Sequence, residues 1–194
     1  MRESLFGKTQ EELKVLSESL GLPSFTGRQL AEWLYKKEVS SFEEMTNLSK
    51  KARALLEANY QTGITAPIDV QESVDGTKKY LFTALVGKYI ETAYIPDGKR
   101  STVCVSSQVG CKMGCLFCMT GKQGFQGNLS SGEILNQYRS IPEWRDITNI
   151  VYMGMGEPLD NLPEVLKSLE ILTAEWGFAL SPRRITVSTI GITP

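Results

Sequence analysis

The sequence contains no histidine, and its four cysteines all fall between Cys104 and Cys118. Without histidine the chain lacks the usual general base and the commonest nitrogen ligand for zinc, so cysteines and carboxylates must supply any such chemistry. Cysteines this close together are poorly placed to join distant parts of a fold through disulfides. Their clustering therefore indicates metal binding or thiol chemistry.

The sequence also lacks a long hydrophobic run and an excess of one charge. No apolar stretch approaches the roughly 18 to 20 residues of a membrane span, and the first residues contain no apolar signal segment. Lysine and arginine number 21 against 22 aspartates and glutamates, a formal net charge of -1. We therefore expect a cytoplasmic protein without membrane contact, on which any RNA site is a local patch.

The first two regions of the chain differ in their patterns. Residues 1–60 are predicted to form an N-terminal helical domain, because apolar residues follow helical spacing after a Thr-x-x-Glu capping box at residues 9–12. Residues 61–100 carry β-branched and aromatic runs, with an Asp-Gly hairpin turn at residues 75–76. This second region is predicted to be a small β-hairpin connecting region.

In the third region, residues 101–194, strands and helices alternate. Strands are expected at residues 102–106, 149–153 and 185–189, and a Ser-x-x-Glu capping box at residues 130–133 opens the first helix between them. This alternation is typical of parallel strands with right-handed crossovers. The sequence thus predicts the α/β class with a partial parallel β/α barrel. Because the sequence ends soon after the third strand, we expect a truncated protein.

Cys111, Cys115 and Cys118 form a Cys-x3-Cys-x2-Cys loop after the first of these strands. Three thiolates can bind three irons of a four-iron cluster, which normally takes four cysteines, and one iron then stays open for another ligand. The alternative is a structural zinc site completed by Cys104, in a zinc-stabilised RNA-binding module without enzymatic activity. Zinc modules usually pair two short cysteine motifs across a longer gap, so the pattern favours iron and sulfur.

A glycine-rich segment, Gly-Met-Gly-Glu-Pro at residues 154–158, follows the second strand. Glycine allows close backbone approach at Gly156, and the Glu157 carboxylate can accept a hydrogen bond from an ammonium group. Alone, the segment could be an ordinary strand-to-helix turn. Ligand-contacting loops leave the C-terminal ends of barrel strands, so we expect this segment, the cysteine loop and Ser188 to converge on one face.

Four segments resemble RlmN-type radical S-adenosylmethionine (SAM) RNA methyltransferases, with the Cfr methyltransferases as close relatives. They are CVSSQVGC at 104–111, GKQGF at 121–125, GMGEP at 154–158 and VSTIG at 187–191. The resemblance extends from about Glu91 to the end of the sequence. It argues against another radical enzyme of the superfamily that acts on a peptide or small molecule.

This resemblance implies that the protein methylates carbon two of adenine in large-subunit rRNA and tRNA through a methyl-cysteine intermediate. It implies a 4Fe-4S cluster and SAM as cofactors, an electron donor such as flavodoxin, and a monomer at full length. The matching positions are Cys111, Cys115 and Cys118 for the cluster, and Gly156, Glu157 and Ser188 for SAM. Cys104 matches the cysteine that helps resolve a protein–RNA adduct, and Glu91 matches the residue assigned as proton acceptor.

Two further expectations follow from the resemblance. The helical domain is expected to contact RNA, with Lys50, Lys51 and Arg53 as candidates. Further candidates near the mouth of the barrel are Lys122, Arg183 and Arg184. The methyl-carrying cysteine of the family lies far toward the C terminus, and no cysteine follows Cys118 in this sequence. We therefore expect this chain alone to bind cofactors without completing the reaction.

Overall fold

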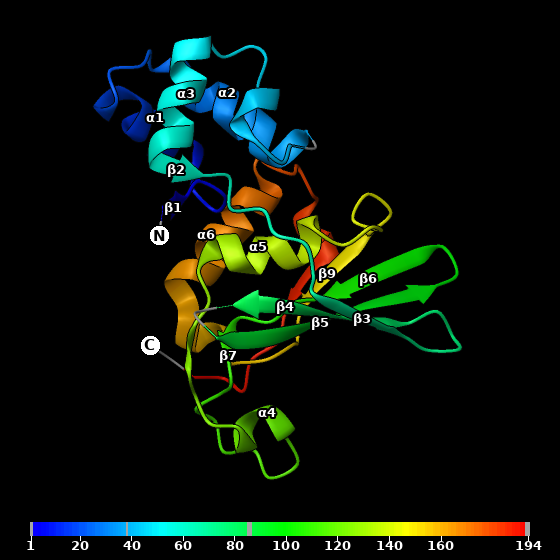
Figure 1. Ribbon diagram of the computed structural model, residues 1–194. Coiled ribbons are helices and arrows are strands. Elements are labelled where there is room, and N and C mark those ends of the chain that lie inside the picture. The colour runs from blue at the N-terminus through cyan, green and yellow to red at the C-terminus, as the bar shows by residue number, and fades with distance from the viewer. Residues whose placement is uncertain (1, 38, 85–86, 193–194) are drawn as a thin grey trace. The chain divides into compact units, whose positions relative to one another are not determined.

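A computed structural model of the chain describes residues 2–37, 39–84 and 87–192 (Figure 1). It divides into two compact units, of which the first contains Met1–Ile64 and Lys167–Leu180, and the second contains Thr65–Leu166 and Ser181–Pro194. The boundary falls within helix α6 (Leu162–Thr173). In the described part of the chain, no helix is both long and apolar enough to cross a membrane.

The first unit is mainly helical, as the sequence predicts. Its helical elements are α1 (Gln10–Ser19), α2 (Phe25–Ala31), the π-helical turn η1 (Glu32–Lys36), the 3-10 turn η2 (Phe42–Glu44), α3 (Lys50–Asn59) and the part of α6 from Lys167 onward. Two short strands that the sequence pattern did not predict, β1 (Glu3–Ser4) and β2 (Tyr60–Gln61), pair in parallel. A strand of two residues is too short to show an alternating pattern, which explains the difference.

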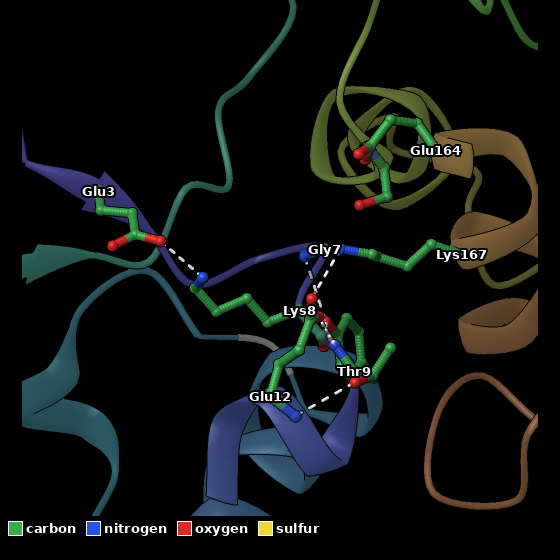
Figure 2. Close-up of polar contacts among 9 residues, drawn as sticks. Glu3, Gly7, Lys8, Thr9, Glu12, Glu164 and Lys167 are labelled. Carbon is green, nitrogen blue, oxygen red and sulfur yellow. Dashed lines mark hydrogen bonds and ion pairs between the residues drawn. The ribbon is translucent and has the colours of Figure 1, made fainter. Parts of the chain in front are cut away.

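The capping box of helix α1 is confirmed (Figure 2). The Thr9 hydroxyl accepts a hydrogen bond from the Glu12 backbone N–H at 3.2 Å, and the Glu12 carboxylate accepts one from the Thr9 N–H at 2.7 Å. The same carboxylate lies 2.7 Å from the Lys167 ammonium group. Burial works to raise the pKa of Glu12, but the hydrogen bonds from Lys167 and Thr9 outweigh it and lower that pKa. The pair joins two distant segments of the first unit.

An aromatic cluster surrounds the buried side chain of Tyr35 in this unit. Its ring lies 5.4 to 5.9 Å, between ring centroids, from those of Phe6, Trp176 and Phe178. The Tyr35 hydroxyl accepts a hydrogen bond from the backbone N–H of Gly7 at 3.1 Å. Burial raises the pKa of Tyr35, so the phenol is neutral. Tyr35 thus satisfies its polar atom while packing the segment Lys167–Leu180 onto the N-terminal residues.

A six-stranded sheet forms the second unit, in the order β10-β9-β6-β5-β4-β3. The strands are β3 (Asp69–Glu72), β4 (Lys78–Ala84), β5 (Lys88–Asp97), β6 (Arg100–Cys104), β9 (Asn149–Tyr152) and β10 (Ile185–Val187). Strands β6, β9 and β10 run parallel, and the others pair antiparallel, with the predicted hairpin between β3 and β4. The α/β class and the partial parallel sheet are confirmed, and residues 65–84 and 87–192 form no closed barrel.

The remaining elements of this unit connect and cover the sheet. They are β7 (Gln108–Val109), paired antiparallel with β8 (Gly127–Asn128), the helices α4 (Met119–Lys122) and α5 (Ser131–Arg139), and the 3-10 turns η3 (Pro158–Asn161) and η4 (Pro182–Arg184). The predicted capping box of α5, Ser130 with Glu133, is present. Helix α5 covers one face of the sheet (Figure 1), where the Thr92 hydroxyl donates a 2.8 Å hydrogen bond to Gln137.

Three predicted features differ from the structure in detail. Strand β6 ends at Cys104 because the Ser106 N–H donates to the buried side chain of Gln137 instead of continuing the ladder. Strand β10 ends at Val187 and β9 at Tyr152, each shorter than predicted.

The two faces of the sheet differ in burial. Successive residues of a strand point to opposite faces, and one face carries the buried side chains Tyr80, Phe82, Ile90, Thr92, Tyr94, Val103, Ile150 and Tyr152. The opposite face carries Lys79 and Glu91, both about half exposed, together with the partly buried Cys104. This open face therefore holds both residues that the family resemblance assigns to catalysis.

Candidate cofactor site

The cysteine loop begins after β7 and runs into the short helix α4. Cys111 is buried, and Cys115 and Cys118 are partly buried. A turn brings the Cys118 N–H within 3.1 Å of the Cys115 carbonyl oxygen. The backbone N–H of Gly121 lowers the pKa of the Cys118 thiol and thus favours the thiolate.

These thiols fit an iron–sulfur cluster by their chemistry. Such clusters are held by cysteine thiolates, and here three free cysteines lie on one short loop. Across residues 2–37, 39–84 and 87–192, no three acidic or cysteine side chains are gathered closely enough to hold a metal ion. The loop also exposes Leu116 and Phe117, at 92% and 91%. A bound cluster therefore requires the three sulfurs to draw together on an exposed loop.

The loop starts at a close backbone contact. Gly110 has a φ of +71°, and a Cβ atom there would lie 1.8 Å from the carbonyl oxygen of Gly124. Next to this contact, the Gln126 N–H donates a 2.9 Å hydrogen bond to the Val109 carbonyl oxygen. Glycine is thus required at Gly110 by both conformation and space, and the contact closes the base of the cysteine loop.

The Gly-Glu-Pro turn, residues 154–158, packs directly against the chain that leads into the cysteine loop. The Met155 N–H donates to the Ser106 hydroxyl at 2.9 Å, and the Met155 carbonyl oxygen accepts from the Ser107 N–H at 2.8 Å. Gly156 has a φ of +96°, and a Cβ atom there would lie 2.5 Å from Cβ of Gln108. Glycine is therefore required at Gly156 by the close approach of Gln108.

Glu157 is 4% exposed, and its carboxylate is engaged by backbone groups. One oxygen accepts from the Leu159 N–H at 3.1 Å, and the other accepts from the Ile190 N–H at 3.0 Å. Ile190 lies two residues after Ser188, whose N–H donates to the Tyr152 carbonyl oxygen at 3.4 Å. The structure thus brings the ends of the three parallel strands together, with Glu157 joining the second to the third.

Glu91 and Cys104 lie on the open face of the sheet, and Cys104 is next to Met153, the residue that precedes this turn. The Glu91 carboxylate forms a 3.0 Å ion pair with Lys79 on the neighbouring strand. Burial raises the pKa of the Cys104 thiol, more than a hydrogen bond from the Met153 backbone lowers it. Cys104 therefore remains a protonated thiol at neutral pH.

Sequence reasoning missed the residue that joins the two loops, Gln108. Its side chain is fully buried, its Oε1 accepts from the Glu157 N–H at 2.9 Å, and its Nε2 donates to Asp160 at 2.7 Å. The same Nε2 donates to Asn128 at 2.8 Å. Its place inside the segment 104–111 was the available signal, because a buried glutamine needs hydrogen-bond partners.

The candidate RNA-contacting residues differ in solvent exposure and in whether they already bond within the protein. In the first unit Lys50 and Lys51 are exposed, whereas the Arg53 guanidinium donates a hydrogen bond to the Glu43 carbonyl oxygen. In the second unit Lys122, Arg183 and Arg184 are exposed. Lys50 and Lys51 are thus the more available of the three candidates in the first unit.

Two family models match the chain in succession. Residues 4–61 match the ribosomal RNA large subunit methyltransferase N-terminal domain, and residues 105–194 match the radical SAM superfamily. The first match covers the helical segment before the sheet. The second begins directly after β6 and contains all the predicted cluster and SAM residues.

Proteins named as RNA methyltransferases are similar to almost the whole chain. A probable dual-specificity RNA methyltransferase RlmN of Parabacteroides distasonis is 56% identical over 192 residues, covering 99% of this chain and 56% of that protein. The dual-specificity RNA methyltransferase RlmN of Desulfotalea psychrophila is 46% identical over 197 residues, covering 95% and 54%. The chain thus spans about half the length of the curated relatives it matches.

The fold is also similar to that of a methyltransferase of known structure. The crystal structure of a radical SAM methyltransferase from Sphaerobacter thermophilus superposes with a TM-score of 0.89 at 38% sequence identity, covering 98% of this chain and 57% of that chain. Sequence, family models and fold therefore relate this chain, over nearly its whole length, to the RlmN-type radical SAM methyltransferases.

Proposed function

We propose that the natural protein carrying this sequence is a radical SAM methyltransferase that acts on carbon two of adenine in large-subunit rRNA and tRNA. One observation carries the proposal. Gln108, in the chain that leads into the cysteine loop, accepts a hydrogen bond from the Gly-Glu-Pro turn, and both lie inside the region that matches the radical SAM superfamily. The relatives named as RNA methyltransferases support the substrate class. They give no support to a zinc-stabilised module.

In this proposal Cys111, Cys115 and Cys118 hold a 4Fe-4S cluster. Gly156, Glu157 and Ser188 contact SAM, Gly156 through its backbone and Glu157 through its buried carboxylate. When bound, the cluster and SAM supply radical chemistry that activates adenine carbon two, which is not acidic enough for an ordinary methyl transfer. The protein orients the reacting groups and excludes water from them.

Glu91 and Cys104 are proposed to act after RNA has become attached to the protein through a methyl-cysteine intermediate. The Glu91 carboxylate would accept the proton from carbon two, held in place by Lys79 at 3.0 Å. Cys104, kept as a thiol by burial, would help to release the product from the adduct. The methyl-carrying cysteine of this route is not assigned within this sequence.

The family resemblance also supplies the proposed RNA contacts, the reductant and the division of the chain into regions. RNA would be contacted by the N-terminal helical domain, residues 1–60, with the exposed Lys50 and Lys51 as candidates. In this proposal the chain continues with a connecting region, residues 61–100, and with part of a barrel, residues 101–194. A reductant such as flavodoxin, a cytoplasmic location and a monomeric full-length state remain predictions.

Anaerobic reconstitution of the natural protein with iron and sulfide tests the cofactor assignment. We expect about four irons per chain and a broad absorption near roughly 400 nm, whereas a zinc site is colourless. Cys111→Ala should lose most of the iron, and Cys104→Ala should keep it. Zinc bound to all four cysteines would overturn the proposal.

Incubation of the loaded protein with SAM, a reductant and unmodified rRNA or tRNA tests the reaction itself. We expect 2-methyladenosine in the digested RNA by mass spectrometry. Modification at another position of adenine would contradict the assigned carbon while leaving the methyltransferase class in place.

A further inference from the structure

Lys112 lies between the first two cysteines of the cluster loop, and its ammonium group is held by Asp160. The Lys112 Nζ lies 2.8 Å from one carboxylate oxygen of Asp160 and 3.0 Å from the other. Asp160 belongs to the turn η3 that directly follows the Gly-Glu-Pro segment. This contact joins residues 48 positions apart in the sequence and has no part in the reaction described above.

Asp160 is fixed from its other side by the buried glutamine. Gln108 Nε2 donates a 2.7 Å hydrogen bond to the Asp160 carboxylate, and Gln108 Oε1 accepts from the Glu157 N–H at 2.9 Å. The Asp160 side chain is 19% exposed, compared with 48% for Lys112. The carboxylate is therefore a fixed acceptor, and Lys112 is the mobile partner that docks on it.

Lys112 makes a second contact that restricts where the loop can lie. Its ammonium group sits 4.4 Å from the centroid of the Phe125 ring, which belongs to the segment returning from the cysteine loop. A cation in this position is attracted to the face of the ring. One side chain thus joins the start of the cysteine loop to its end and to the Gly-Glu-Pro turn.

We propose that Lys112 and Asp160 form a positioning pair that anchors the cysteine loop to the Gly-Glu-Pro turn and so holds a bound cluster beside the SAM segment. The role in cluster retention rests on the proposed function, whereas the anchoring itself does not. The pair acts on the loop through position, since neither side chain is a cluster ligand. Its effect should be greatest on the opening of the loop, because half-exposed ion pairs add little to global stability.

Limited chymotrypsin digestion of the natural protein without cluster tests the anchor. Leu116 and Phe117 are more than nine-tenths exposed, so cleavage after them reports how often the loop opens. We expect Asp160→Asn and Lys112→Met to speed this cleavage by about threefold to tenfold, as for the loss of one charge-assisted hydrogen bond. Lys112→Arg should stay near the parent rate, because it keeps the charge.

Two comparisons separate anchoring from a general loss of stability. Lys14→Met removes an exposed ion pair with Glu11 in the first unit and should leave cleavage after Phe117 unchanged. The double variant, Lys112→Met with Asp160→Asn, should be cleaved no faster than the faster of the two single variants, because each single change already removes the Lys112–Asp160 contact. The proposed anchoring would be contradicted if the two changes had additive effects on the cleavage rate, or if both single variants were cleaved at the parent rate.

The loaded protein tests the consequence for the cluster. After anaerobic reconstitution, iron transfer to an excess of chelator should be several-fold faster in Asp160→Asn than in the parent, and Lys112→Arg should restore slow transfer relative to Lys112→Met. Equal rates in all variants would overturn the role in cluster retention. A parent that takes up no iron would contradict the proposed function. The digestion would still test whether Lys112 and Asp160 anchor the cysteine loop.

Discussion

Glu91 and Cys104 lie on the same face of the six-stranded sheet, on the neighbouring strands β5 and β6. Ala93 is the pairing partner of Cys104 and lies two residues after Glu91, so all three side chains point to one side. Diagonal neighbours of this kind are roughly 7 to 8 Å apart, within reach of a common substrate. The proposed base and thiol therefore come from adjacent strands, outside the cysteine loop.

The first prediction concerns these two residues in the natural, cluster-loaded protein. Cys104→Ala and Glu91→Gln should lower the yield of methylated RNA by about 100-fold or more, the usual contribution of a general base or thiol partner. Both variants should accumulate a covalent protein–RNA species, because they block the step that releases RNA. A denaturing gel before and after ribonuclease treatment would detect it.

Cys115→Ala serves as the matched control, since it also removes one thiol but should prevent cluster binding. It should give neither product nor adduct. Methylation at the parent rate by Cys104→Ala, or an adduct of equal yield in Cys115→Ala, would contradict the assigned roles.

The second prediction concerns Gln137, a fully buried glutamine on α5. Its side chain accepts from the Ser106 N–H at 2.7 Å and donates to the Ser106 carbonyl oxygen at 2.9 Å. Gln137→Leu leaves both backbone groups buried without partners, so the free energy of unfolding should fall by about 2 to 4 kcal/mol. Thr92→Val removes only the hydroxyl partner of Gln137 and should cost about 1 kcal/mol. Urea unfolding measures both, and a smaller loss for Gln137→Leu than for Thr92→Val would contradict this account.

Local sequence signals predicted the elements of this fold well. The capping boxes at Thr9 and Ser130 each lie within four consecutive residues, and both helices begin where the boxes predict. The hairpin turn at residues 75–76 likewise depends on the residues at the turn itself. The parallel order of β6, β9 and β10 followed from the alternation of strands and helices along the chain.

Long-range polar contacts could not be predicted in the same way. Neither the pairing of Lys112 with Asp160 nor the three hydrogen bonds of the Gln108 side chain follows from a periodic pattern, because the partners are far apart in sequence. Residues 61–100 were predicted as a β-hairpin connecting region, and their strands β4 and β5 lie in the same sheet as β6. Strand patterns indicate which face is buried but do not identify the neighbouring strand.

The third prediction concerns Gly156 in the Gly-Glu-Pro turn. Gly156→Ala combines a positive φ of +96° with a Cβ atom 2.5 Å from Cβ of Gln108, so it should displace the turn. We expect a loss of about 2 to 4 kcal/mol in the free energy of unfolding and at least a tenfold weaker affinity for SAM. Calorimetric titration of the reconstituted protein with SAM measures the affinity.

Gly98→Ala is the control for conformation alone, since Gly98 has a φ of +57° and open space around it. It should cost about 1 to 2 kcal/mol and leave SAM affinity unchanged. Equal losses of affinity in the two variants would show that the contact with Gln108 is not what makes glycine necessary in the turn.

The fourth prediction concerns the dependence of stability on pH through Glu143. Its carboxylate accepts hydrogen bonds from the Lys78 ammonium group and the Tyr80 hydroxyl, each at 2.8 Å. Burial acts to raise the pKa of Glu143, but these two hydrogen bonds outweigh it and hold that pKa below its usual value. A carboxyl group whose pKa is lower in the folded state stabilises the protein at pH values above the pKa of the unfolded chain, about 4.3. This stabilisation is lost as the pH falls through the pKa of the folded state.

Glu143→Gln should therefore lower the free energy of unfolding by about 1 to 3 kcal/mol at neutral pH, because it removes the charge that Lys78 and Tyr80 share. The difference from the parent should shrink steadily below roughly pH 4, where the parent carboxylate also becomes neutral. Urea unfolding at a series of pH values between about 3 and 7 measures it. Glu11→Gln, which removes an ion pair with Lys14 at 70% and 44% exposure, should change stability by less than about 0.5 kcal/mol throughout. A Glu143→Gln difference that stayed constant with pH would show that the loss comes from packing, and not from the charge.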